Sequence, residues 1–267
     1  MRANTQVEHV TPSANLTVVT ATGSTPGPQR SVNEDRVLVG RRSGDASAPL
    51  VLAVADGMGG HDGGATASEA AINAVVLSQE NWDTDRGDWF ERLTGLFALA
   101  QRCVAERASS PHGPRPMGST LTAVVIDRRS VVFGHAGDSR FYVFRAGRLR
   151  QMTSDHTVAH DLLARGDITP EDAAVHAGKS ILTRAITSAD PVEPEQGHID
   201  LVVGDLLLLV TDGVHGALAD ADIVAELASV DAGALPSLQR AVDRLLTAVR
   251  EKSGKDDASI VLAGVTR

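Results

Sequence analysis

The fold class is decided by residues 119–145, which read STLTAVVIDRRSVVFGHAGDSRFYVFR. This stretch holds three short runs rich in β-branched and aromatic residues: Ser119–Asp127, Ser130–Ala136 and Ser139–Arg145. Turn residues separate the runs, and strands that follow one another this closely are typical of antiparallel neighbours. The stretch therefore predicts an antiparallel meander.

Further strands and helices surround this meander in an order that does not alternate. Strands are expected at residues 16–21, 36–40, 50–55, 199–203, 206–210 and 258–265, and helices at 65–79, 88–107, 158–164, 220–228 and 234–251. Groups of strands followed by pairs of helices favour antiparallel sheets covered by helices, an α+β sandwich. The polar residues 1–15 are expected to form a disordered N-terminal tail.

The composition argues against several classes of partner. The 34 acidic and 25 basic residues give a net charge of −9, which disfavours nucleic acid as a ligand. One cysteine, Cys103, allows no disulfide within the chain and fits a reducing compartment. The first fifteen residues hold no apolar run, and the longest runs, such as Leu206–Val210, are too short to cross a bilayer. We therefore expect a cytoplasmic protein that does not bind membranes, and we take a monomer as the default.

Acidic residues recur where the predicted strands begin or end. Asp56 and Asp212 each follow a buried apolar run and precede a glycine, and Asp35, Asp138 and Asp256 also lie at strand ends. One such aspartate is usually a turn residue. A carboxylate at the mouth of a buried strand is costly unless it is paired, and no lysine or arginine adjoins Asp56 or Asp212 in the sequence. Because oxygen ligands suit hard cations, the set predicts a site for Mg²⁺ or Mn²⁺.

These acidic residues lie in segments that resemble the motifs of bacterial metal-dependent (type 2C) serine/threonine protein phosphatases. The matching segments, in chain order, are residues 30–35 (RSVNED), 54–61 (VADGMGGH), 118–120 (GST), 137–140 (GDSR), 153–156 (TSDH), 211–213 (TDG) and 256–259 (DDAS). The resemblance implies a four-layer αββα sandwich, with two antiparallel β-sheets between helix pairs. It also implies a single catalytic domain over residues 16–267, with a flap subdomain at about 157–196.

The resemblance further implies which residues hold metal ions. Asp56 would bridge two core Mn²⁺ or Mg²⁺ ions, and the Gly57 carbonyl would complete one of the two sites. Asp212 and Asp256 would ligate one metal, and Asp138 would form with Asp212 a third, weaker site. Two cations about 3.5–4 Å apart neutralise a phosphate dianion and lower the pKa of a bridging water, so that hydroxide attacks the phosphorus.

Other residues are expected to act around the metals. Asp35, with Glu34 near it, would support the metal ions through water. Arg30 lies where the family holds the substrate phosphate, and a guanidinium offers a planar fork to two phosphate oxygens. Many members have a histidine two residues after the bridging aspartate, where this chain has Met58. His61 is the nearest replacement for that proton donor.

Two positions are harder to interpret. Asp257 stands where many members have asparagine, and the sequence does not say what the added charge does. His156 and His160 are four residues apart, a spacing that could suggest zinc. No third ligand is nearby in the sequence, which argues against a zinc site.

The leading hypothesis is hydrolysis of phosphoserine and phosphothreonine in proteins, opposing a bacterial serine/threonine kinase. The alternatives are a catalytically impaired regulatory binding module and a phosphatase for a small phosphorylated metabolite.

Overall fold

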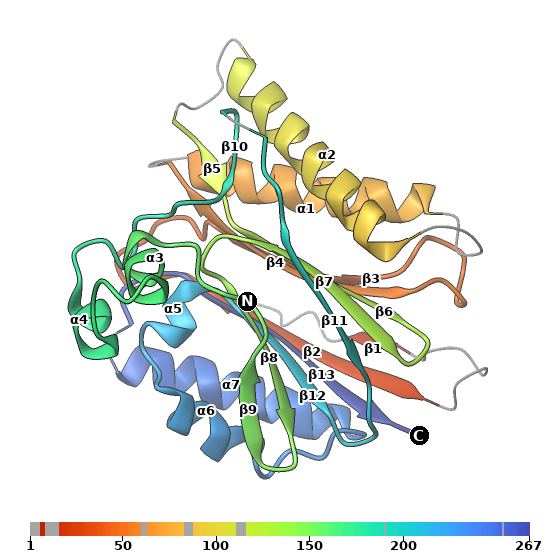
Figure 1. Cartoon of the computed structure of the whole chain (residues 1–267). Coiled ribbons are helices and arrows are strands. Elements are labelled where there is room, and N and C mark those ends of the chain that lie inside the picture. The colour runs from red at the N-terminus through yellow and green to blue at the C-terminus, as the bar shows by residue number, and fades with distance from the viewer. Residues whose placement is uncertain are drawn as a thin grey trace.

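Two antiparallel β-sheets lie face to face, and helices cover both outer sides (Figure 1). The structure is a computed structural model and describes residues 6–8, 16–59, 63–82, 88–110, 116–189, 191–252 and 254–267. The sandwich expected from the sequence is confirmed. His61 and most of the predicted tail at 1–15 lie outside the described residues. Within that tail, the backbone of Gln6–Glu8 pairs with Val18–Thr20.

The first sheet has the strand order β1-β2-β13-β12-β8-β9. Its strands are β1 (Gln6–Glu8), β2 (Thr17–Thr25), β13 (Ala258–Thr266), β12 (Leu206–Val210), β8 (Arg140–Arg145) and β9 (Arg148–Gln151). The strand β12 is buried along its whole length and pairs with β13 on one side and β8 on the other. Its two ends therefore mark the two ends of the sheet.

The second sheet has the strand order β10-β5-β4-β6-β7-β11, and a further strand, β3, pairs with β4. The strands are β10 (Ile186–Thr187), β5 (Gly118–Ser119), β4 (Leu50–Met58), β6 (Leu121–Asp127), β7 (Ser130–Ala136), β11 (Glu195–Asp200) and β3 (Asp35–Gly40). All pairings within it are antiparallel.

The predicted meander needs one correction. The strands β6 and β7 pair as expected, but β8 belongs to the other sheet, where it pairs with β12 and β9. The chain changes sheets at Gly137, whose φ of 121° is a conformation that favours glycine. The neighbour of β7 is instead β11, which covers Glu195–Asp200 and not the apolar run 199–203. That run ends in a turn where Val202 and Val203 are exposed.

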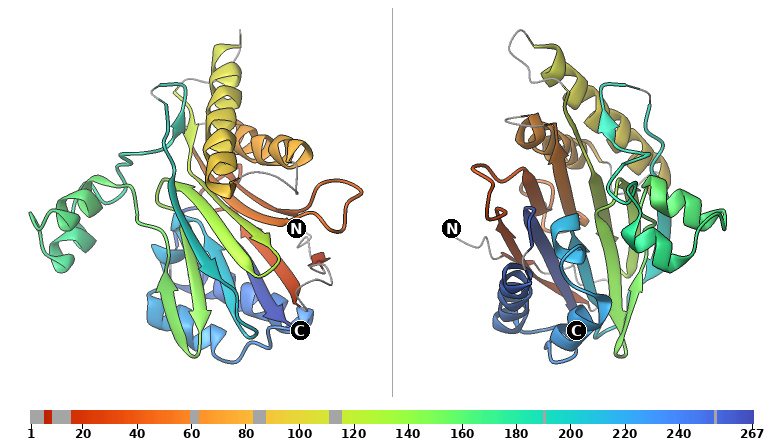
Figure 2. Two further views of the ribbon diagram at one scale, coloured as in Figure 1. Left: turned by 45° about the vertical axis from the view of Figure 1, so that its right-hand side comes forward. Right: turned by 90° about the vertical axis from the view of Figure 1, so that its left-hand side faces the viewer.

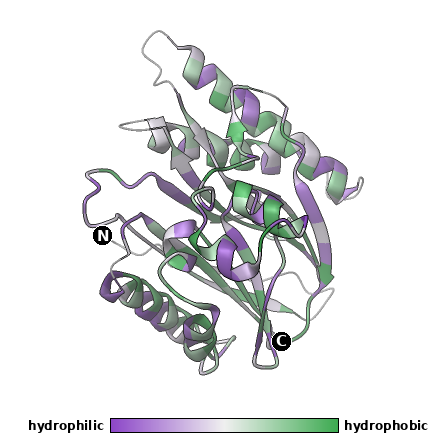
Figure 3. Cartoon of the chain, turned by 60° about the vertical axis from the view of Figure 1, so that its left-hand side comes forward, coloured by the Kyte–Doolittle hydropathy of each residue, from purple (hydrophilic) through white to green (hydrophobic). Residues whose placement is uncertain are grey.

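Three clusters of buried apolar side chains fill the three spaces between layers. The alternation of side chains along β4 shows the arrangement: Leu50, Leu52 and Val54 face the other sheet, whereas Val51 and Ala53 belong to the cluster under the helices α1 (Gly63–Asn81) and α2 (Trp89–Ser109). The helices α5 (Asp212–His215), α6 (Asp220–Leu227) and α7 (Leu235–Glu251) cover the first sheet in the same way. Figure 3 shows hydrophilic and hydrophobic residues side by side on the outer helices, as expected of helices with one buried face.

Two short helices, α3 (Val158–Ala164) and α4 (Pro170–Val175), project from the body beside one end of the sandwich (Figure 2). Thr169 and Asp172 form a capping box at the start of α4, and Pro170 occupies its first turn. These helices lie within the segment expected to be a flap. Within the described part of the chain, no helix is long and apolar enough to span a membrane.

Candidate metal centre

The predicted carboxylates gather at one end of the sandwich because of how the strands pair. Asp35 and Asp56 are direct partners in the ladder between β3 and β4. The strand β4 continues through Asp56 to Met58 and does not end at Ala55 as predicted. In the first sheet, Asp212 follows β12 and Asp256 precedes β13. Since β12 and β13 are antiparallel, both residues lie at the same edge.

A hydrogen bond joins the two sheets at this edge. The Thr211 hydroxyl donates to Asp35 Oδ2 across 2.7 Å, and the Ser259 amide donates to the same hydroxyl across 2.9 Å. The Thr211 amide in turn donates to the Ser259 carbonyl. The carboxylate of Asp35, which is 3% exposed, is therefore fixed by the sheet opposite its own. Nothing in the sequence indicated that Thr211 has this role.

Two oxygens of the cluster lack the partners that buried polar atoms normally have. Asp35 Oδ1 and Asp212 Oδ1 are buried without a hydrogen bond, and among the described residues only Gln79 Nε2 shares this condition. Buried polar side-chain atoms are nearly always satisfied, so two unsatisfied acceptors at one place suggest a missing donor or cation. A divalent cation with oxygen ligands fits both atoms.

The carboxylates also raise one another's pKa values. Burial, with the nearby Asp212 charge, raises the pKa of Asp35 and of Asp138 to about 7. Burial and Asp256 raise the pKa of Asp212 to about 6. Burial and the charges of Asp35, Asp212 and Asp138 raise the pKa of Asp56 well above its ordinary value. These shifts show that four aspartates share one poorly solvated space, where a cation would stabilise the ionised forms.

The segment before β3 brings a cation next to the cluster. The Arg30 guanidinium makes ion pairs with Glu34 and with Asp256. Glu34 is buried, and its carbonyl accepts hydrogen bonds from the Gly57 amide at 3.2 Å and from the Ser68 hydroxyl. The structure thus brings Arg30, Glu34, Gly57 and Asp256 to the edge where the other predicted residues lie. His61 lies outside the described residues.

Asp138 is held from the helix that Asp212 begins. The His215 Nε2–H group of α5 donates to the Asp138 carbonyl across 2.9 Å. Burial and the Arg140 charge lower the pKa of His215 to about 4, so the ring is neutral near pH 7. His215 was not among the residues predicted from the sequence. Its only signal was its place in the first turn after Asp212-Gly213.

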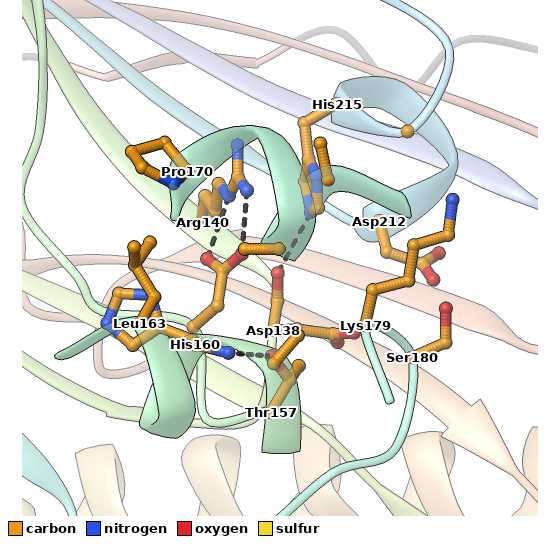
Figure 4. Close-up of a pocket in the computed structure, with 15 residues that line it drawn as sticks. Asp138, Arg140, Thr157, His160, Leu163, Pro170, Lys179, Ser180, Asp212 and His215 are labelled. Atoms are coloured by element: carbon orange, nitrogen blue, oxygen red, sulfur yellow. Dashed lines mark hydrogen bonds and ion pairs between the residues drawn. The ribbon is translucent and has the colours of Figure 1, made fainter. Parts of the chain in front are cut away.

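A hollow of about 390 Å³ connects this edge to the projecting helices. Figure 4 shows Asp138, Asp212 and His215 at the same hollow as Lys179 and Ser180, which follow α4. The floor is stiffened by a two-bond ion pair: Arg140 donates to the Asp155 carboxylate from Nε at 2.8 Å and from a terminal nitrogen at 2.6 Å. The hollow therefore joins two aspartates of the cluster, Asp138 and Asp212, to the segment that follows α4.

A second group of possible ligands does not fit a metal. His135, His156 and Glu195 have ligand atoms within 4.8 Å of one another. His156 Nδ1, however, accepts the Gly137 amide at 3.1 Å, and the Arg184 guanidinium lies 3.2 Å from its Nε2. His135 Nε2 bonds the Ser154 carbonyl, and its Nδ1 bonds the Thr122 hydroxyl. A metal-bound histidine normally donates through its other nitrogen, which His156 does not do. These three residues therefore form a hydrogen-bonded polar network.

Comparison with known proteins agrees with this geometry. Residues 27–256 match the family described as protein phosphatase 2C. The serine/threonine protein phosphatase PstP of Mycobacterium tuberculosis is 33% identical over 245 residues, which are 92% of this chain and 44% of that protein. The protein phosphatase PhpP of Streptococcus pneumoniae is 30% identical over 197 residues, which are 74% of this chain and 79% of that protein.

Solved structures show the same fold. The M. tuberculosis phosphatase PstP superposes with a TM-score of 0.83 at 32% identity, over 94% of this chain and 99% of that one. The catalytic domain of PstP in complex with two manganese ions superposes with a TM-score of 0.81 at 31% identity, over 95% of this chain and all of that one. The chain spans less than half the length of full PstP. It belongs to the protein phosphatase 2C family.

Proposed function

We propose that this chain hydrolyses phosphoserine and phosphothreonine in proteins with the help of Mn²⁺ or Mg²⁺. The observation that carries the proposal is the cage of aspartates with two buried, unpartnered oxygens, on Asp35 and Asp212. Membership of the protein phosphatase 2C family supports it, as do two manganese ions in the solved PstP domain. We further propose that the protein acts as a cytoplasmic monomer and opposes a serine/threonine kinase.

Each residue of the cage would have its own role in binding the cations. The charges of Asp35, Asp212 and Asp138 all act on Asp56, which suits a residue that would bridge two ions. The core sites would be completed by the Gly57 carbonyl, Asp212 and Asp256, and Asp35 would support them through water. A third metal site would be formed by Asp138 with Asp212. When bound, the cations supply charge neutralisation for the phosphate and activate the attacking water.

The protein's own groups then bind and orient the substrate. Arg30 lies beside Asp256, so a phosphate on its planar guanidinium would stand at the rim of the cage. The hollow between Asp138 and Ser180 offers room for the substrate side chain. The leaving alkoxide needs a proton, and Met58 cannot supply one. His61 remains our candidate for that role.

The test is hydrolysis of a phosphothreonine peptide and of p-nitrophenyl phosphate, with and without Mn²⁺. We expect the wild type and Asp205→Asn, a buried carboxylate at the far end of β12, to require Mn²⁺ and to be active. We expect Asp212→Asn to lose about a hundredfold or more of kcat/KM, because it removes a ligand that stabilises transition-state charge.

Three outcomes would overturn the proposal. Turnover at the wild-type rate in chelator would contradict metal dependence. No Mn²⁺ binding by calorimetry, in a folded and inactive wild type, would favour the regulatory binding module. A strong preference for small phosphorylated metabolites over the phosphopeptide would favour the metabolite phosphatase.

A further inference from the structure

The segment that carries Arg30 has no regular secondary structure of its own. It runs from Gly27 to Glu34, between the end of β2 and the start of β3. One turn hydrogen bond, from the Arg30 amide to the Gly27 carbonyl at 3.0 Å, shapes its first half. Val32 is 42% exposed, so little packing holds the middle of the segment. Its position depends on what fixes its two ends.

The Glu34 end is also held by the Gly57 amide and the Ser68 hydroxyl, but one side chain binds both ends, that of Asp257. Its Oδ1 accepts the Gly27 amide at 2.8 Å, and its Oδ2 accepts the Glu34 amide at 2.7 Å. The residue is 2% exposed, and these bonds connect positions 230 and 223 residues apart. A carboxylate can accept at both oxygens, whereas an asparagine side chain has one acceptor and would turn an N–H group toward one of the two amides.

The backbone on either side of Asp257 touches the same segment. A Cβ atom on Gly27 would lie 2.6 Å from the Lys255 carbonyl oxygen and 2.9 Å from the Asp256 carbonyl carbon. The Arg30 guanidinium spans from Glu34 to Asp256. Residues 27–34 thus contact residues 255–257 through a close backbone approach, two hydrogen bonds donated by backbone amides and an ion pair.

We propose that Asp257 is a positioning residue that holds Arg30 at the rim of the metal cage and thereby sets the affinity for the substrate phosphate. This inference rests on the proposed function, in which Arg30 binds that phosphate. Asp257 does not touch the substrate itself. It fixes the distance between Arg30 and the ligand Asp256, its neighbour in sequence, and its buried charge also favours the nearby guanidinium. The charge that the sequence left unexplained thus has a function.

The test compares Asp257→Asn with wild type and with Asp205→Asn. Asp205 is a matched control, because it is also buried and also accepts a backbone amide, that of Val202 at 2.8 Å, but far from Arg30. We expect Asp257→Asn to raise KM for p-nitrophenyl phosphate and the inhibition constant of inorganic phosphate by about five- to tenfold, the loss of one strong hydrogen bond. We expect kcat to stay within about twofold and Mn²⁺ affinity by calorimetry to be unchanged, because only ground-state binding is lost.

A double-mutant cycle separates positioning from a general structural role. In an Arg30→Ala background, Asp257→Asn should raise the phosphate inhibition constant no further, because residues acting through one another are not additive. Gly27→Ala is a second variant, for use if Asp257→Asn fails to fold. It disturbs the same backbone contact and leaves Asp257 intact, and we expect it to weaken phosphate binding as well.

The outcomes are distinguishable. Unchanged phosphate affinity in Asp257→Asn, or an equal effect with and without Arg30, overturns the role of Asp257 alone. Unchanged phosphate affinity in Arg30→Ala overturns the proposed role of Arg30 and, with it, this inference.

Discussion

The strand β12 has an aspartate at each end, and the two differ in whether other residues satisfy them. Asp205, just before the strand, is 1% exposed and receives three hydrogen bonds. Arg145 donates two of them, at 2.6 and 2.7 Å, and the Val202 amide donates the third. Asp212, just after the strand, has a buried oxygen without a partner and lies near Asp56 and Asp256.

The difference shows how one fold separates structural from functional charge. A buried carboxylate is tolerated when a cation and hydrogen bonds satisfy it, as Arg145 does for Asp205. At the other end no side chain of the described residues satisfies Asp212 Oδ1, and further carboxylates are added. We propose that cations from solution occupy that end, so that its stability depends on metal.

The largest effect should come from removing the charge at each end in chelator. Asp205→Asn should lower the free energy of unfolding by about 3 kcal/mol, because an asparagine has one acceptor oxygen and cannot accept all three hydrogen bonds that Asp205 accepts. Asp212→Asn should raise it by about 1 kcal/mol, because a like charge leaves a crowded space. Urea denaturation at neutral pH in EDTA measures both, with circular dichroism as a control for the fold. Changes of the same sign in the two variants would contradict the comparison.

Much of the architecture could be predicted because it is local. The apolar run of β12 and the spacing of α7 are visible in neighbouring residues, so the layers were predicted correctly. The assignment of β8 to the opposite sheet could not be predicted, because it depends on pairing with β12, some sixty residues later. Strands as short as β5 and β10 carry too few residues for any periodic pattern.

The candidate site, like the fold, could be predicted only in its local features. The aspartates were found because each lies at a strand end next to a recognisable motif. Their partners were not, since these come from distant positions. Thr211 meets Asp35 across 176 residues, and Arg145 meets Asp205 across 60. A sequence read without contacts shows where charges occur but not which of them are satisfied.

A second, smaller contrast uses the glycines beside the same two aspartates. A Cβ on Gly213 would lie 2.0 Å from the Asp257 carbonyl oxygen, so Gly213→Ala must move the start of α5, which carries Asp212, away from residues 256–257. Gly204 has a φ of 96° but nothing within 4 Å of its Cβ position. We expect a loss of about 2–3 kcal/mol for Gly213→Ala and about 1 kcal/mol for Gly204→Ala.

Urea midpoints measure both losses, and Mn²⁺ calorimetry adds a second criterion. Only the Gly213 variant should bind Mn²⁺ more weakly, because only it moves metal ligands. Equal Mn²⁺ affinity in the two variants would show that the Asp212 end tolerates displacement, contrary to the contrast drawn here.

The smallest expected effect is a pH dependence confined to the Asp212 end. The folded, metal-free protein holds Asp35 and Asp138 with pKa values of about 7 and Asp212 at about 6. Raised carboxyl pKa values mean that the folded state binds more protons than the unfolded one, so these groups cost stability as pH rises from about 4 to about 7. Mn²⁺ binds the ionised forms and should offset that cost.

The melting temperature in Mn²⁺ minus that in EDTA should therefore be a few degrees larger at about pH 8 than at about pH 5. His135 and His215, whose pKa values are lowered to about 4, favour stability at higher pH. Their contribution is present with and without metal and cancels in the difference. Asp205→Asn should keep this pH dependence and Asp212→Asn should reduce it. A difference independent of pH would mean that the carboxylates at the Asp212 end are already ionised without metal, and that their unpaired oxygens do not mark a place for cations.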